Sequence, residues 1–334
     1  MLENVTRCTV VLCFFYGSAY SYSQTAPATT KQFIPAGELN LQASSPTFPT
    51  GRVPVWSGGA LVTFEKNGTL NPIVHAVDLS GVDTVIPFSI AGATFVHVDY
   101  VAHAADGTLA LAGGTMDAAS HPAGFIALLS ADRLSATVIR MPGFFYPMSL
   151  AIVQDGTVWA AGWEAVDATG YRKNYEGAIL RHFGRSGEVI GSALPWKTIP
   201  AALKDRVSDH GLMASSSSSL GWMLNGGPYY EISLSTSGVK QFPALPLHGT
   251  SETVVGLGLT DGGDVFAGTS VSGGDLPSGY YLYFLNRNTA SWQPVAMPNV
   301  VGAGASESRL LGSQGNMLVF QTKDQNSLRL FTVN

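Results

Sequence analysis

The sequence has few charges, almost no cysteine and no long apolar run, and each shortage excludes a class of protein. Charged residues make up 12% of the 334 residues and the net charge is −5, so no basic surface for nucleic acid is expected. No apolar stretch reaches about 18 residues, so no membrane span is expected. Both cysteines, Cys8 and Cys13, lie near the N-terminus. The rest of the chain therefore offers neither a disulfide nor thiol chemistry.

The first 23 residues are expected to form a secretory signal peptide. Arg7 precedes an apolar run from Val10 to Tyr16, and small residues follow as far as Ser23. This order is typical of a signal peptide cleaved after Ser23, with a buried strand as the alternative. Cleavage removes both cysteines and leaves residues 24–35 as a flexible leader. The protein is therefore expected to be secreted or periplasmic.

A unit of roughly fifty residues recurs along the chain, marked by a turn followed by a short apolar strand. Its six copies are SGGALVTF from Ser57, ADGTLALAGG from Ala105, QDGTVWAAGW from Gln154, SSLGWMLNGG from Ser218, TDGGDVFAGT from Thr260 and SQGNMLVFQT from Ser313. A period of this length, made of strands and turns, is typical of β-propeller blades. The sequence therefore predicts one all-β domain, a six-bladed β-propeller of four-stranded antiparallel blades over residues 36–334. Seven blades are the alternative, if residues 36–56 form more than one strand.

The last repeat lacks a fourth strand, which indicates how the ring closes. After NMLVFQ the chain provides only one more strand, Ser327–Val333. A strand-like segment without a blade of its own, Gly37–Gln42, lies at the other end of the domain. We expect these two segments to pair, because closure removes the exposed sheet edges that promote aggregation.

In these repeats the chain resembles the broad six-bladed superfamily of NHL-repeat, gluconolactonase-like and virginiamycin B lyase-like proteins. The resemblance covers residues 36–334 and is one of blade pattern. Gluconolactonase-like enzymes use acidic and amide side chains around a metal near the channel. The lyases use a histidine and a glutamate, for which His97 or His210 with Glu252 would have to stand in. No complete catalytic motif of any member is present, so no catalytic residue is carried over.

Loop lengths differ between the two faces of the predicted ring. Turns between first and second and between third and fourth strands are short, and they define the short-turn face. The opposite, long-loop face carries the segments 115–123, 164–176, 196–209 and 270–278, with a short helix expected over 200–207. Binding residues concentrate on long loops. A candidate rim for an anionic or sugar ligand is Tyr171, Arg172, Lys173, Lys204 and Arg206. The alternative is that these are solvated loop charges.

A second set of candidates lies at the predicted mouth of the central channel on the long-loop face. Counting nine residues back from the first turn of each blade, and including neighbours in sequence or two residues along, gives His97, Asp99, Tyr146, Asp209, His210, Glu252 and Glu307. Strand residues two apart share a side, so these side chains are expected to face one cavity. Clustered carboxylates bind a hard cation or shift a carboxyl pKa for acid–base chemistry. The expected ligands of such a cation are Asp209, Glu252 and Glu307. Polar channel lining without function is the alternative.

The expected function is a binding module that acts through the long-loop face, because the candidate catalytic set is incomplete. The corresponding positions of the first and last blades are Pro49 and Ala305, which carry no chemistry. The alternative is a metal-assisted hydrolase or lyase of lactonase type at the channel mouth. No cofactor is predicted, apart from Ca²⁺ or Mg²⁺ under that alternative. The expected partner is a protein, glycan or small molecule, and the protein is expected to be a monomer.

Overall fold

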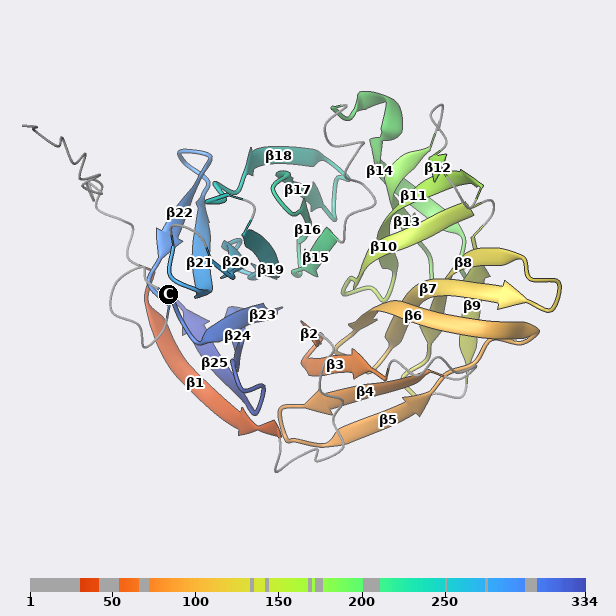
Figure 1. Cartoon of the computed structure of the whole chain (residues 1–334), viewed down its shortest axis with the longest axis horizontal. Coiled ribbons are helices and arrows are strands. Elements are labelled where there is room, and N and C mark those ends of the chain that lie inside the picture. Colours follow the sequence, from red (N-terminus) through yellow and green to blue (C-terminus); the bar gives the residue numbers. More distant parts are fainter. Residues whose placement is uncertain are drawn as a thin grey trace, which may run out of the picture. The chain divides into compact units, whose positions relative to one another are not determined.

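Six antiparallel sheets stand side by side around a common centre (Figure 1). The computed structural model describes residues 31–41, 54–65, 72–132, 135–141, 144–167, 170–171, 177–200, 211–249, 251–273, 276–297 and 305–334. Each sheet is built on four antiparallel strands, one sheet has a short fifth strand beside them, and successive sheets follow one another around the ring. The prediction of a six-bladed β-propeller is confirmed.

The first three blades run, from the ring centre outward, through consecutive strands. Blade 1 contains β2 (Val55–Ser57), β3 (Ala60–Phe64), β4 (Ile73–Asp78) and β5 (Asp83–Pro87). Blade 2 contains β6 (Ala93–His103), β7 (Leu109–Asp117), β8 (Pro122–Leu129) and β9 (Ala136–Arg140). Blade 3 contains β10 (Phe144–Ile152), β11 (Val158–Asp167), β13 (Ala178–Phe183) and β14 (Val189–Pro195), with the short strand β12 (Gly170–Tyr171) beside β11.

The other three blades repeat this order, and the last one borrows its outer strand. Blade 4 contains β15 (Gly211–Ser215), β16 (Ser219–Leu224), β17 (Pro228–Ser233) and β18 (Val239–Ala244). Blade 5 contains β19 (Glu252–Leu259), β20 (Val265–Val271), β21 (Gly279–Asn286) and β22 (Ser291–Val295). Blade 6 contains β23 (Ser308–Gln314), β24 (Met317–Thr322), β25 (Ser327–Val333) and, from the N-terminal side of the domain, β1 (Phe33–Asn40).

The ring closes through β1, as the incomplete last repeat predicts. β1 pairs antiparallel with β25 along its length, from Phe33 opposite Val333 to Asn40 opposite Ser327. The strand starts earlier than the predicted segment 37–42, because Phe33 packs against Phe266 of blade 5 with ring centroids 6.0 Å apart. The closing strand is therefore anchored in the apolar layer between blades 5 and 6 as well as by its ladder.

Two of the predicted long loops are partly strand. The ladder between β7 and β8 continues to Met116 opposite Pro122, so most of segment 115–123 is a hairpin. Its turn is held by Asp117, whose Oδ1 accepts the N–H groups of Ala119 and His121 at 2.8 and 2.9 Å. In the segment 164–176, β11 extends to Asp167 and pairs with β12. Hydrogen bonds along a ladder satisfy the backbone better than a solvated loop of the same length. The predicted helix over 200–207 lies mostly outside the described residues, and the described η1 (Trp196–Thr198) is a 3-10 turn.

The core is divided among the blade interfaces. One apolar cluster joins blades 3 and 4 and contains Trp159 and Trp222, which are 2% and 1% exposed. Similar clusters lie between the other neighbouring blades, including blades 6 and 1 across the closure. Both sides of each sheet are thus covered by its neighbours, so the strands are apolar on both faces and the blades stack as successive layers.

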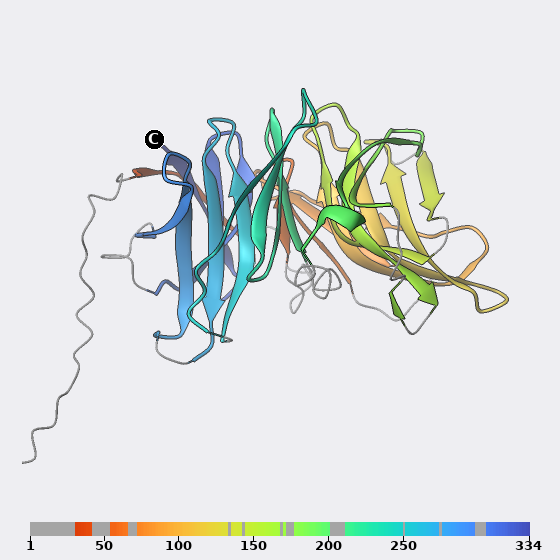
Figure 2. The same cartoon turned by 90° about the horizontal axis from the view of Figure 1, so that it is seen from above.

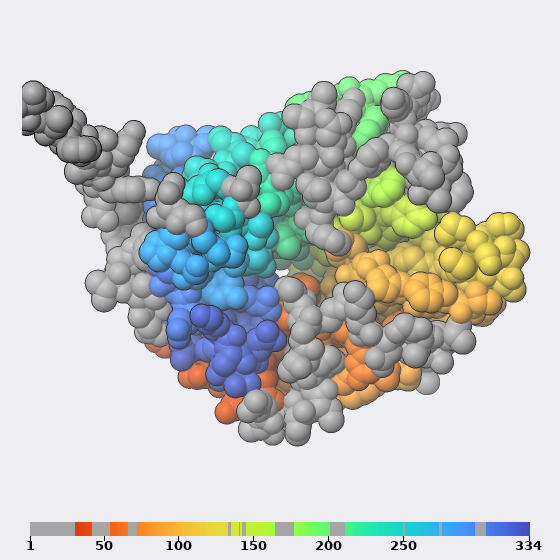
Figure 3. All heavy atoms as spheres, in the orientation of Figure 1, coloured from red at the N-terminus to blue at the C-terminus, as the bar shows by residue number. Residues whose placement is uncertain are grey.

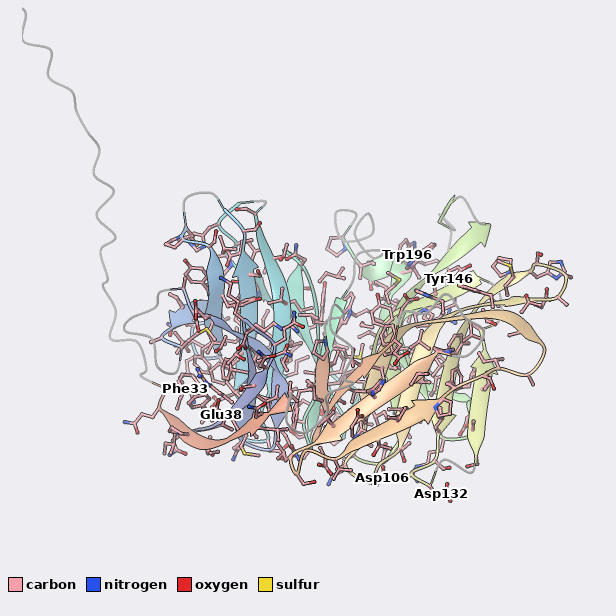
Figure 4. The ribbon with its side chains drawn as sticks, turned by 60° about the horizontal axis from the view of Figure 1, so that its bottom comes forward. Phe33, Glu38, Asp106, Asp132, Tyr146 and Trp196 are labelled. Carbon is pink, nitrogen blue, oxygen red and sulfur yellow. The ribbon has the colours of Figure 1, made fainter. Side chains whose placement is uncertain are left out.

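The strands of each blade run between the two faces of the ring (Figure 2). Asp106, in the turn between β6 and β7, and Asp132, between β8 and β9, lie at one edge (Figure 4). Tyr146, near the start of β10, and Trp196, in the connection after β14, lie at the opposite edge (Figure 4). The first edge is the short-turn face and the second is the long-loop face.

Candidate functional site

The central channel is lined mainly by small and apolar side chains. The blades pack closely around it (Figure 3), and its free volume is about 90 Å³. Every innermost strand contributes, from β2, β6, β10, β15, β19 and β23. Its polar side chains are the three serines Ser57, Ser215 and Ser313. None of the candidate carboxylates or histidines among the described residues lines this channel.

The common register assumed for the candidates does not extend to Glu252, and bulges in the innermost strands also interrupt the period of two. His97 and Tyr146 each lie six residues before the last paired residue of their strand, His103 and Ile152, whereas Glu252 lies seven residues before Leu259. The ladder shifts between Val98 and Tyr100 in β6, and similar shifts occur in β10, β19 and β23. A β-bulge adds one residue to one strand, so the side of the sheet that each later residue faces is exchanged. Counting nine residues back from the turn crosses this bulge. The residues upstream of it therefore do not share the side that a strict period of two predicts.

Glu252, the first residue of β19, is buried in blade 5 rather than exposed at the channel mouth. Its side chain is 0% exposed. Oε1 accepts hydrogen bonds from Thr269 Oγ1 at 2.6 Å and from Tyr283 Oη at 3.1 Å. Oε2 accepts one from the backbone N–H of His248 at 2.7 Å and lies 3.0 Å from His248 Nδ1. Thr269 and Tyr283 come from β20 and β21, on the side of the blade that packs against blade 4.

These hydrogen bonds determine the charge of the cluster. Burial by itself raises the pKa of the Glu252 carboxyl, but the hydrogen bonds from His248, Thr269 and Tyr283 outweigh it and hold the pKa below its ordinary value. An ionised carboxylate is thus held inside the blade. The His248 side chain is 39% exposed, and its Nε2 has no partner among the described residues. The chain therefore presents a surface imidazole that a buried carboxylate orients.

His97 and Asp99 form a separate pair on β6 of blade 2. His97 Nε2 lies 2.7 Å from Asp99 Oδ1, and both side chains are 35% exposed. The imidazole also stacks on Phe95, with ring centroids 6.2 Å apart. Asp99 is the additional residue at the bulge of β6. Blades 2 and 5 are three positions apart in the ring of six, and the structure does not bring this pair together with Glu252.

The remaining described candidates stand apart. Tyr146 packs against Trp163 of the next strand, with ring centroids 5.5 Å apart, and is half-buried. Glu307 is exposed just before β23 and makes no ion pair with a described residue. Tyr171 lies on β12. The other candidates are outside the described residues, namely Arg172, Lys173, Lys204, Arg206, Asp209 and His210.

Of the three residues expected to bind a cation, Glu252 has both carboxylate oxygens occupied by hydrogen bonds from Thr269, Tyr283 and His248. In the part of the chain that is described, no group of three or more histidine, cysteine or acidic side chains is placed to hold a metal ion.

A polar pocket of about 400 Å³ lies at the other end of the channel, on the short-turn face. All six blades line it, and its polar side chains include His103, Asp106, Gln154, Asp261 and Gln314. The serines at the ends of three innermost strands join neighbouring blades here, since Ser57 Oγ donates to His103 O at 2.8 Å. Ser215 Oγ donates to Ile152 O in the same manner, and Ser313 Oγ to Leu259 O. These three serines thus join blades 1 and 2, 3 and 4, and 5 and 6.

Sequence reasoning missed His248, Thr269 and Tyr283, which complete the Glu252 cluster. His248 precedes Glu252 by four residues, and this spacing was the available signal. Thr269 and Tyr283 are brought to the carboxylate by the ladders among β19, β20 and β21. No local pattern in the sequence distinguishes them from other strand residues.

Comparisons with known proteins name no family for this chain. No protein-family model and no curated protein matches the chain. Among solved structures, it is similar to the β-propeller domain of the Trilobed protease from Pyrococcus furiosus, with a TM-score of 0.47 and 12% sequence identity. That match covers 81% of this chain and 78% of the other. Among the described residues, no helix has the length and hydropathy needed to cross a membrane. The six blades and their closure, described above, define the protein as a six-bladed β-propeller.

Proposed function

We propose that this protein is a secreted or periplasmic β-propeller of the NHL-repeat and gluconolactonase-like superfamily that acts as a binding module through its long-loop face. One observation carries the proposal. The polar candidate residues on that face bind to a neighbour in their own blade, and these pairs lie on different blades. His97 is held by Asp99 in blade 2, and Glu252 by His248 and Tyr283 at blade 5. Catalysis needs groups that converge on one reacting atom. The half-exposed members of these pairs, His97, Asp99 and His248, lie on separate blades and so suit recognition.

A ligand screen with face-specific variants tests this proposal. Oligosaccharides, small organic acids and peptides are screened by the shift in melting temperature, which follows mass action. We expect any ligand found to lose at least tenfold in affinity with Tyr146→Ala, on the long-loop face. The matched control Asp132→Ala, on the short-turn face, should leave the affinity unchanged. If Asp132→Ala weakens ligand binding and Tyr146→Ala does not, the ligand does not bind at the long-loop face and the proposal is wrong.

One observation favours a second function, a hydrolase or lyase. A buried ionised carboxylate orients the His248 imidazole through Nδ1, and the other ring nitrogen is left for a substrate. This is the geometry that a general base requires. A screen of lactones and esters, with and without Ca²⁺ or Mg²⁺, should then give turnover that His248→Ala abolishes. The control is His121→Ala, because His121 also pairs with a carboxylate four residues away but is 77% exposed at a hairpin turn. Turnover that survives His248→Ala would exclude this site.

A further inference from the structure

Arg309 lies at the long-loop end of β23, the innermost strand of blade 6. Its Nε and Nη2 both donate to Gln321 Oε1, at 3.1 and 2.6 Å. Gln321, on the neighbouring strand β24, is only 1% exposed. Arg309 itself is half-buried. The guanidinium is thus fixed in place by one neutral amide oxygen.

Two other arginines of the domain, Arg287 and Arg329, have carboxylate partners, whereas none is found for Arg309 among the described residues. Arg287 holds Glu231 through two hydrogen bonds, at 3.2 and 2.6 Å. Arg329 lies 3.7 Å from Glu38. For Arg309, no carboxylate of the described residues lies within 4.0 Å, although Glu307 is only two residues away in sequence.

Burial makes this uncompensated charge costly. Desolvation lowers the pKa of Arg309, because the surroundings stabilise the cation less well than water does. Tyr280 acts on the pKa of Arg309 in the opposite direction but does not offset the desolvation. An anion that reached Arg309 would therefore gain a partly desolvated charge pair, which is stronger than a pair in water.

The geometry of the guanidinium determines which anion fits. A guanidinium carries five N–H donors in one plane. Gln321 occupies the side edge, formed by Nε and Nη2. The end edge, formed by Nη1 and the second N–H of Nη2, has no acceptor among the described residues. This edge presents two parallel donors, the arrangement that pairs with a carboxylate or phosphate through two hydrogen bonds.

We infer that Arg309 anchors an oxyanion-binding site on the long-loop face, where its end edge takes the carboxylate or phosphate group of a ligand. This inference rests on the proposed binding function and names the ligand class for that face. Gln321 acts as the positioning residue, because it fixes the plane of the guanidinium.

Titration of the full chain with inorganic phosphate, and separately with acetate, tests the inference and distinguishes the two oxyanions. The readouts are isothermal calorimetry and the melting temperature, at constant ionic strength. We expect saturable binding of at least one anion. Arg309→Lys keeps the charge but removes the paired donors, and it should weaken binding at least tenfold. Arg329→Gln, which removes an arginine of the same blade that already has a carboxylate partner, should leave binding unchanged.

A second variant keeps the test decisive if changes at Arg309 impair folding. Gln321→Glu replaces the amide by a carboxylate of the same shape, so it supplies the missing counter-charge from within the protein. We expect it to raise the melting temperature without added anion and to abolish the anion effect. Equal anion binding by the unchanged protein, Arg309→Lys and Gln321→Glu would overturn the inference. If a ligand binds Arg309→Lys as tightly as the unchanged protein and still loses affinity with Tyr146→Ala, the oxyanion site is rejected while the proposed binding function stands.

Discussion

At the scale of single residues, the buried Glu252 carboxylate carries more polar contacts than the other candidates. It accepts hydrogen bonds from three residues on two strands and one loop. Glu252→Gln keeps the shape but places an N–H₂ group against donors. We expect a loss of about 2 kcal/mol in the free energy of unfolding at pH 7, the usual size for hydrogen bonds to a charged group. Urea denaturation measures it, and the exposed Glu307→Gln is the control, with a change below about 0.5 kcal/mol.

The same residue predicts a dependence of stability on pH. The pKa of Glu252 in the folded protein lies below its ordinary value of 4.5. Its contribution to stability is therefore complete above about pH 4.5 and is lost as the pH falls through the lower folded pKa. Denaturation curves between about pH 3 and pH 6 should show a shallower loss of stability for Glu252→Gln than for the unchanged protein. Parallel curves for the two proteins would show that the carboxylate is not preferentially ionised in the folded state.

A single hydroxyl between two blades provides a second residue-scale prediction. Ser313 Oγ donates to Leu259 O at 2.9 Å and accepts the N–H of Leu259 at 2.8 Å. Ser313→Ala leaves both backbone groups without that partner, so we expect a loss of about 1–2 kcal/mol. The melting temperature in thermal denaturation checks it. Ser235→Ala, on an exposed turn, should have no measurable effect, and equal losses in both would show that the joint between blades is unimportant.

At the scale of elements, stability depends on the closing strand. β1 covers the outer edge of β25 and places Phe33 in the layer between blades 5 and 6. Deleting residues 33–41 should expose that edge, lower the melting temperature sharply and promote aggregation. Light scattering during thermal denaturation measures both effects. Ile34→Ser, at an exposed position of the same strand, should change the melting temperature little. An unchanged melting temperature after the deletion would contradict the closure.

In most of the predicted turns between strands, glycine occupies the position with positive φ, as expected. Gly107 and Gly156 have φ of 92° and 77°, in the region that glycine adopts without strain. In the turn between β17 and β18 the residue with positive φ is Ser237, at 55°, rather than the following Gly238. The pair Ser237-Gly238 thus identifies the turn but not the position within it that needs the left-handed conformation.

At the scale of the whole molecule, the expected removal of the N-terminal signal peptide can be tested by measuring the mass of the mature protein. The charge, apolar run and small residues before Gln24 predict cleavage after Ser23. We expect the intact mass of the protein purified from its native compartment to correspond to a chain that begins at Gln24. This chain has no cysteine, so its melting temperature should be the same with and without a reducing agent. A mass that includes Cys8 and Cys13 would contradict the signal peptide.

The sequence by itself determined the blades and their closure. Each repeat combines a turn, where glycine adopts positive φ, with an apolar strand, and these are local properties that six copies reinforce. The incomplete last repeat and the unassigned strand near residue 37 predicted the pairing of β1 with β25. Both conclusions depend on hydrogen-bonding patterns and apolar periodicity, which a chain carries along its length.

Only the tertiary structure decided which polar side chains meet. Glu252 lies one residue further from the end of its strand than His97 and Tyr146 do, and it faces Thr269 and Tyr283 instead of the channel. Arg309 likewise owes its surroundings to the ladder that places Gln321 opposite it. A bulge changes one ladder step and leaves the apolar pattern almost unaltered. The side of the sheet that a residue faces therefore depends on the exact number of residues between it and the turn that joins the paired strands. Neither the composition nor the apolar period of the sequence records that number.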